Sequence, residues 1–237
     1  MMPILGRPML EYQLERLSRC ASFERLVVAT SSDPSDDVLA ALCRDVGVDC
    51  YRGSLDDVLD RFLQAALPYA PDVVVRLTGD CPLADPSLID EIVVRFLASD
   101  LDYLSNCAPP TYPDGLDVEV TRLACLKAAW TEAVLPSQRE HVTPFIRKQP
   151  GRFRIGNHAR SEDLSSLRWT VDEPEDFEFV REVYERLYPG KPDFSTDDVL
   201  ALLRESPELK QFNARFQRNE GTRKSLLADA AFLAEKK

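Results

Sequence analysis

The chain of 237 residues is predicted to adopt an α/β fold with a mostly parallel sheet flanked by helices. Short apolar runs alternate with segments of helical periodicity over the first hundred residues, which is the order of repeated strand–helix units. Residues 72–76 form an almost continuous apolar run, as in strands covered on both faces of a parallel sheet. Asp-Pro pairs at residues 33–34 and 85–86 mark helix starts, because proline is well tolerated in the first helical turn.

The elements predicted for the first half follow this alternation. A helix begins at Pro8, and Leu10, Leu14 and Leu17 recur on one of its faces. Gly47 ends the second helix, since glycine is favoured just beyond a helix C-terminus. The predicted strands are residues 25–30, 48–51, 72–76 and 101–104, and helices begin near residues 8, 33, 55 and 85.

The second half predicts a different order of elements. Residues 117–120 alternate polar and apolar, as in a partly exposed or mixed strand. Helices are expected at 122–135, 136–148, 174–188 and 195–205, a strand at 153–156, and a further apolar strand at 167–171. Residues 189–192 have the composition of a linker. We therefore expect an α/β domain over residues 1–188 and a helical C-terminal extension over 189–237, which packs on the core or on a partner subunit.

Charge and cysteine content exclude several classes of protein. Lys and Arg total 29 and Asp and Glu total 40, so the formal charge is −11, which argues against a general nucleic-acid or anionic-membrane binder. The six cysteines form no Cys-x-x-Cys pair, and we interpret them as reduced structural thiols of a cytoplasmic protein. No apolar run approaches the roughly 20 residues that span a bilayer.

Candidate site residues follow the strands, because ligands bind beyond the carboxyl ends of strands in open α/β sheets. Thr30 ends one strand; Arg52 and Ser54 follow the next and precede a helix that carries Arg61. Alone, these residues fit an anion or base contact as well as ordinary helix capping.

Asp80 follows the buried strand 72–76 within the segment Thr78-Gly79-Asp80, and Asp172 lies at a later strand-to-helix turn. Mg²⁺ prefers one or two carboxylates together with phosphate oxygens, so both residues are candidate metal ligands. Each is also a plausible helix or turn cap, and sequence spacing does not place them side by side.

Two further groups are candidates with open alternatives. Asp117 and Glu119 share one face of a predicted strand, where they are either solvated or part of a substrate pocket. His141 lies near a helix start and is an acid or base, a phosphate contact or a structural residue.

Taken together, eight segments in this order resemble the cytidylyltransferase family that includes CMP-sialic acid synthetases, most closely its spore coat polysaccharide branch. The resemblance covers nearly the whole chain, and each segment is weak on its own. The segments are residues 5–12, 27–31, 52–61, 76–83, 114–119, 139–144, 169–172 and 218–221, among them Arg76-Leu-Thr-Gly-Asp-Cys-Pro-Leu83, Asp114-Gly-Leu-Asp-Val-Glu119 and Arg218-Asn-Glu-Gly221.

The resemblance implies a Rossmann-like nucleotidyltransferase fold and transfer of CMP from CTP to a sugar, expected to be a sugar acid, with release of pyrophosphate. It implies Mg²⁺ as cofactor and a possible homodimer. Carried over by motif, Asp80 and Asp172 become metal ligands and, with Arg76, the catalytic set. The nucleotide side is then Thr30, Arg52, Ser54, Arg61, Thr78 and Gly79, and the acceptor side is Asp114, Asp117, Glu119 and His141.

One departure from the family pattern leads to an expectation of weak activity. Members begin with a strand and a basic loop of the form Arg-x-Gly-Ser-x-Arg-Leu-Pro-Gly-Lys, whose backbone N–H groups hold the triphosphate. Here Met1 stands just downstream of that position. We expect poor CTP binding, and we expect that a start about 20–25 residues upstream restores it. A nucleotide-sugar-dependent glycosyltransferase and a catalytically degenerate scaffold are the alternatives.

Overall fold

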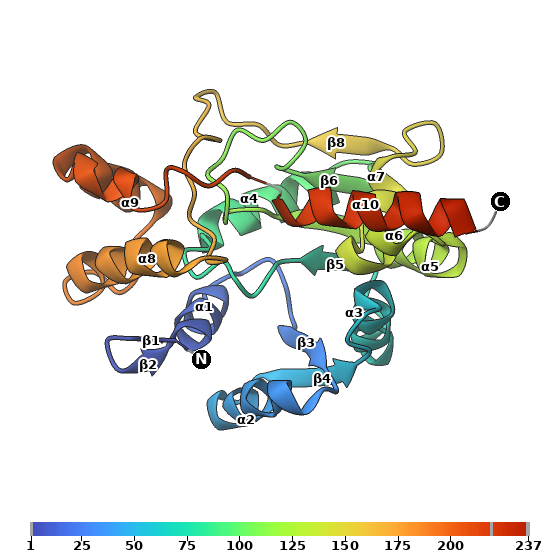
Figure 1. Cartoon of the computed structure of the whole chain (residues 1–237), viewed down its shortest axis with the longest axis horizontal. Coiled ribbons are helices and arrows are strands. Elements are labelled where there is room, and N and C mark those ends of the chain that lie inside the picture. Colours follow the sequence, from blue (N-terminus) through green and yellow to red (C-terminus); the bar gives the residue numbers. More distant parts are fainter. Residues whose placement is uncertain (1, 219, 236–237) are drawn as a thin grey trace.

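The computed structural model describes residues 2–218 and 220–235 and is built around a mixed sheet (Figure 1). The sheet has the strand order β5-β7-β6-β8, formed by β5 (Val73–Arg76), β7 (Glu119–Arg122), β6 (Tyr103–Ser105) and β8 (Ile155–Asn157). Strand β7 is antiparallel to both neighbours, whereas β6 and β8 are parallel. The α/β class is confirmed, but the prediction of a mostly parallel sheet is wrong for this part of the molecule.

Two further strand pairs lie outside that sheet. Strands β3 (Val27–Ser31) and β4 (Asp49–Gly53) are parallel and pair in register from Val27 with Asp49 to Ser31 with Gly53. Strands β1 (Pro3–Ile4) and β2 (Arg7–Pro8) form a short antiparallel hairpin that the sequence did not predict. Within the described residues, neither pair hydrogen-bonds to the four-stranded sheet.

Helices cover the strands and follow the predicted starts closely. Proline occupies the first turn of α4, where the Asp85 carboxylate accepts a hydrogen bond from the Ser87 backbone N–H at 3.0 Å. Gly47, with φ of +74°, ends α2 as predicted. The helices are α1 (Met9–Leu17), α2 (Asp37–Val46), α3 (Val58–Ala66), α4 (Pro86–Leu97), α5 (Leu123–Glu132), α6 (Pro136–His141), α7 (Pro144–Arg147), α8 (Pro174–Leu187), α9 (Thr196–Glu205) and α10 (Glu220–Glu235), with short 3₁₀ turns η1 (Pro34–Asp36), η2 (Leu67–Tyr69) and η3 (Pro207–Gln211).

Two apolar clusters hold these elements together. The larger one joins α1, α4, α8 and α9 to the sheet and includes the fully buried Trp169, Phe179 and Ile92. The smaller one joins α3, α5 and α7 around Leu59 and Ile146. Helix α10 lies along α6 (Figure 1), where the buried Asp229 carboxylate accepts hydrogen bonds from the Ser137 N–H and hydroxyl at 2.8 and 2.6 Å.

Two local predictions differ from the structure. The predicted helix 136–148 is divided into α6 and α7, because Val142 has a φ of +70° and Pro144 starts the second helix. Residues 167–171 are not a regular strand, since their ladder contact is a single bridge between Arg168 and Asp114. Among the described helices, none is long and apolar enough to cross a bilayer.

Candidate active site

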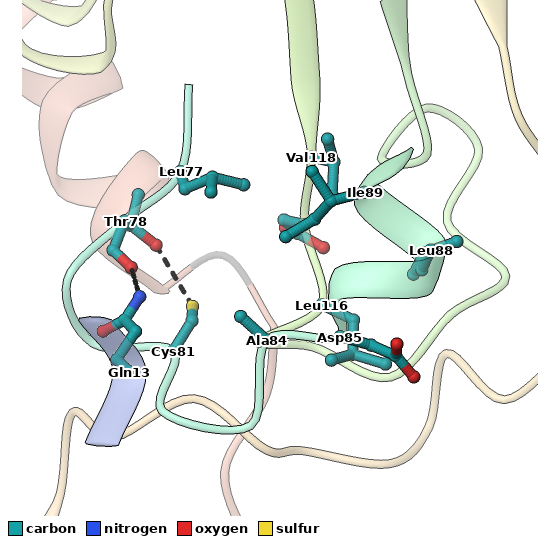
Figure 2. Close-up of a pocket in the computed structure, with 12 residues that line it drawn as sticks. Gln13, Leu77, Thr78, Cys81, Ala84, Asp85, Leu88, Ile89, Leu116 and Val118 are labelled. Carbon is teal, nitrogen blue, oxygen red and sulfur yellow. Dashed lines mark hydrogen bonds between the residues drawn. The ribbon is translucent and has the colours of Figure 1, made fainter. Parts of the chain in front are cut away.

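The loop after β5 is fixed from within and from α1. The Thr78 hydroxyl and the Cys81 thiol are 3.1 Å apart, and the Gln13 side chain donates to the Thr78 carbonyl at 2.7 Å. Figure 2 shows these side chains beside a cavity of about 10 Å³, lined on its other side by Leu116 and Val118. The loop is therefore held rigidly against the segment that precedes β7.

This rigid loop presents Asp80 next to the segment that carries Asp172. The Val171 N–H donates to the Asp80 carbonyl at 2.8 Å, so the two loops are joined one residue before Asp172. The Asp80 carboxylate accepts a hydrogen bond from the Cys81 thiol at 3.2 Å, while Asp172 is half-exposed and paired with Arg168 at 2.7 Å. Sequence spacing could not establish this proximity of the two segments.

Gly115 allows a third segment to approach the same place. It has a φ of +103°, and a Cβ here would lie 2.5 Å from the Thr170 nitrogen and from the Trp169 carbonyl carbon. Next to this close approach, the Trp169 N–H donates to the Asp114 carbonyl at 2.6 Å. Residues 114–117 are thereby placed directly against the segment that leads to Asp172.

A buried arginine that the sequence did not single out organises the resulting acidic cluster. The Arg168 guanidinium contacts Asp176 at 2.9 Å, Asp172 at 2.7 Å and Asp114 at 3.3 Å, and only 9% of its side chain is exposed. Burial disfavours charge on Asp176, but hydrogen bonds from Arg168, Asn213 and nearby backbone outweigh it and lower the pKa of that carboxyl.

Asp114 and Asp117 are partly buried acids whose pKa values are raised. Burial raises the pKa of Asp114 to about 6, although the neighbouring Arg218 and Arg168 oppose the rise. Burial also raises the pKa of Asp117, against the opposing effect of Arg218. Groups of this kind, clustered beside the ends of strands, are typical of functional sites.

Glu119 lies on β7, opposite Arg76 on β5, and its carboxylate is fully engaged. One oxygen accepts hydrogen bonds from the Tyr103 and Thr143 hydroxyls, and the other is paired with Arg76. Burial opposes the charge, but Arg76 and the two hydroxyls outweigh it and lower the pKa of Glu119. Arg76 keeps a buried Nε without a partner among the described residues. The pair joins β5 to β7 next to the segment that carries Asp117.

The predicted nucleotide-side residues gather at the ends of β3 and β4. The Thr30 hydroxyl donates to Asp36 at 2.8 Å, and Arg52 donates to the Ser31 carbonyl at 2.9 Å. Arg61 donates to the Ser54 carbonyl at 3.0 Å, and its buried Nε has no partner among the described residues. Thr78 and Gly79 lie instead on the loop after β5. The structure thus forms two groups from these six residues.

His141 lies at the C-terminal end of α6 and faces α10. Its Nε2 is 2.8 Å from the Ser225 hydroxyl, which also donates to Glu140 at 2.7 Å. Burial lowers the pKa of His141. Its described contacts are therefore with the C-terminal helix rather than with Asp114 or Asp117.

Comparisons with known proteins place this geometry in a family. The family model described as "Cytidylyltransferase" matches residues 1–214. The chain belongs to the cytidylyltransferase family. It is 35% identical to the uncharacterized protein MJ1063 of Methanocaldococcus jannaschii, over 88% of this chain and 84% of that protein. It is 31% identical to spore coat polysaccharide biosynthesis protein SpsF of Bacillus subtilis, over 87% of each.

Other members of the cytidylyltransferase family extend the comparison. A solved cytidylyltransferase from Leptospira borgpetersenii superposes with a TM-score of 0.84 at 32% identity and covers 89% of this chain and 88% of its own. A 3-deoxy-manno-octulosonate cytidylyltransferase of Zea mays is 35% identical over 103 residues, which is 40% of this chain and 32% of that protein. The chain is therefore a nucleotidyltransferase with the Rossmann-like fold of this family.

The donor set of this cytidylyltransferase suits a hard cation that also binds phosphate. Over residues 2–218 and 220–235, no three His, Cys, Asp or Glu side chains gather into a complete metal site. Asp80 and Asp172 lie on two loops that the hydrogen bond from the Val171 N–H to the Asp80 carbonyl joins. Mg²⁺ is commonly held by one or two carboxylates together with substrate phosphates and water, so this pair fits it.

Sequence reasoning missed Arg168 and Asp176 and left Arg218 without a role. Arg168 and Asp176 flank Asp172 at four-residue spacing on each side, and opposite charges at such spacing were a usable signal. Arg218 lies 101 residues after Asp117 in the chain, and no local pattern indicates the contact between them.

Proposed function

We propose that this chain transfers CMP from CTP to a hydroxyl group of a sugar acid and releases pyrophosphate. The observation that carries the proposal is the hydrogen bond between Val171 and Asp80, which joins the loop that carries Asp80 to the loop that carries Asp172. The relatives named for spore coat polysaccharide biosynthesis and for 3-deoxy-manno-octulosonate support the polysaccharide context and a sugar-acid acceptor.

Each group of site residues would have its own role in this reaction. The acceptor hydroxyl oxygen bonds to the α-phosphorus, and the bond from that phosphorus to the bridging oxygen of the β-phosphate breaks. Pyrophosphate leaves, and the hydroxyl proton is released to solvent or taken up by the pyrophosphate. Asp80 and Asp172 would hold Mg²⁺, which supplies charge neutralisation on the phosphate oxygens when bound. Arg52, Arg61 and Thr30 would orient the nucleotide, together with Ser54 and the Thr78-Gly79 turn. Positioning of this kind supplies a large share of the rate in phosphoryl-type transfers.

The acceptor side is assigned to the partly buried acids. Asp114 and Asp117 would accept hydrogen bonds from acceptor hydroxyls, since an ionised carboxylate offers only acceptor positions. Glu119 and Arg76 would support these acids through their buried pair, and His141 would hold α10 over the same end of the sheet. In this arrangement Asp114 and Asp117 would contact the acceptor, and the other predicted residues would support them.

The cellular setting is part of the same proposal. CTP and six unpaired thiols suit the reducing cytoplasm, where we place the reaction as a step of surface or spore-coat polysaccharide biosynthesis. A homodimer is proposed from the family resemblance, and analytical ultracentrifugation of the full chain tests it. A monomer at all concentrations would contradict that part.

The test is pyrophosphate release from CTP and 3-deoxy-manno-octulosonate, measured with and without Mg²⁺. Because CTP binding is expected to be weak, the assay uses a high CTP concentration, and we expect slow release that needs CTP, acceptor and metal together. Asp80→Asn should lower the rate at least about 100-fold because a charged metal ligand is removed. Asp100→Asn, an exposed carboxylate paired with Arg154, is the matched control and should leave the rate unchanged. Transfer from a nucleotide sugar without pyrophosphate release would contradict the proposal.

A further inference from the structure

The segment between α9 and α10 contacts the acidic cluster around Arg168. After η3, the Asn213 amide donates to the Arg168 carbonyl at 2.9 Å and to Asp176 at 2.8 Å. A cavity of about 200 Å³ remains beneath the segment, lined in part by Trp169, Lys210 and Phe216. Polar contacts from Asn213 therefore join this segment to the site.

The segment ends at Arg218, whose guanidinium enters the group of acids proposed for the acceptor. It is paired with Asp117, donates to the Tyr112 carbonyl at 3.0 Å and approaches Asp114 at 3.7 Å. Only 13% of the Arg218 side chain is exposed. The Asp114 side chain is 14% exposed and that of Asp117 is 32% exposed, so the contact of Arg218 with Asp114 is the better shielded from solvent.

The neighbouring cations are committed to other carboxylates. Arg76 is paired with Glu119, and Arg168 is shared between Asp172 and Asp176 in addition to Asp114. Among the described residues, Arg218 is the cation that an ion pair joins to Asp117. Removal of Arg218 would leave two neighbouring, partly buried carboxylates with a reduced counter-charge, which favours movement of one of them or its uptake of a proton.

We propose that Arg218 is a positioning residue that holds Asp114 and Asp117 in place for the hydroxyl groups of the acceptor, so that the C-terminal segment is part of the acceptor site. The inference rests on the proposed function and deepens it. A displaced or protonated carboxyl group no longer offers the same acceptor positions to a hydroxyl. The nucleotide-side residues at β3, β4 and α3, namely Thr30, Arg52, Ser54 and Arg61, lie outside these contacts. Arg218 should therefore affect the acceptor and not CTP.

The experiment compares three variants of the full chain with 3-deoxy-manno-octulosonate and CTP as probes. Arg218→Gln should raise KM for the sugar acid at least about tenfold while KM for CTP stays within about twofold. Arg218→Lys keeps the charge and should recover part of the loss. Arg215→Gln is the matched control, because Arg215 lies in the same segment but forms an exposed pair with Glu175. It should leave both KM values unchanged.

Other outcomes distinguish this inference from a purely structural role of Arg218. Equal changes in both KM values, or a lower melting temperature with unchanged KM values, would overturn it. If Arg218→Gln does not fold, the KM split in Arg218→Lys decides. If the wild type releases no pyrophosphate, the proposed function fails, and calorimetric titration of the sugar acid without CTP then tests the inference separately. Equal affinity in wild type and Arg218→Gln, or no binding by the wild type, overturns it.

Discussion

Replacement of Glu119 by glutamine should destabilise the fold strongly. The side chain is 9% exposed and receives hydrogen bonds from Tyr103, Thr143 and Arg76. Glutamine keeps the shape but removes the charge opposite a buried guanidinium, and breaking a buried pair in this way costs about 3–5 kcal/mol. For a domain of this size each kcal/mol shifts Tm by about 2–4 °C, so we expect a fall of roughly 6–20 °C.

Urea unfolding, followed by the fluorescence of the buried Trp169, measures this change in the free energy of unfolding. Glu178→Gln is the control, because Glu178 forms an exposed pair with Arg181 on α8, and such pairs contribute about 0–1 kcal/mol. A loss below about 1 kcal/mol in Glu119→Gln would refute the reasoning. Since folding lowers the pKa of Glu119 from 4.5, its stabilisation is present above pH 4.5 and is lost as the pH falls below that value.

Three further predictions concern the site. Gly115→Ala places a Cβ 2.5 Å from the Thr170 nitrogen at a φ of +103°, and we expect a loss of at least about 2 kcal/mol in urea unfolding; an unchanged midpoint would contradict this. Since the pKa of Asp114 is about 6, kcat/KM for the acceptor should rise with pH through that value, and Asp114→Asn should abolish the rise. Arg61→Met should raise KM for CTP about tenfold with the acceptor KM unchanged, whereas parallel changes would exclude a role for Arg61 on the nucleotide side.

The alternation of strands and helices was sufficient to predict the α/β class and the placement of candidate residues after the strands. Asp80 lies on the loop after β5 as expected, because a buried apolar strand and its following turn are both visible in local sequence. The direction of β7 was not visible, since strand direction depends on which elements meet and not on local pattern. The pattern at 167–171 indicated a strand. These residues instead form hydrogen bonds with Asp80 and Asp114 and do not pair with a neighbouring strand in a regular ladder.

The ionic organisation of the site was largely beyond prediction. Glu119 and Asp117 were predicted as one pair of acids on one face, yet Glu119 is committed to Arg76 while Asp117 is paired with Arg218. These partners come from positions 43 residues before Glu119 and 101 residues after Asp117, and only the fold brings them together. The residue roles and the expectation of weak CTP binding remain predictions.

The most direct test of the central claim is the identity of the reaction product. The wild-type chain is incubated with CTP, Mg²⁺ and 3-deoxy-manno-octulosonate, and the product is analysed by mass spectrometry and phosphorus NMR. We predict a CMP–sugar with a single phosphodiester and an equal amount of pyrophosphate, both absent with Asp80→Asn. A wild-type chain that binds CTP and the sugar acid but forms no CMP–sugar would contradict the account.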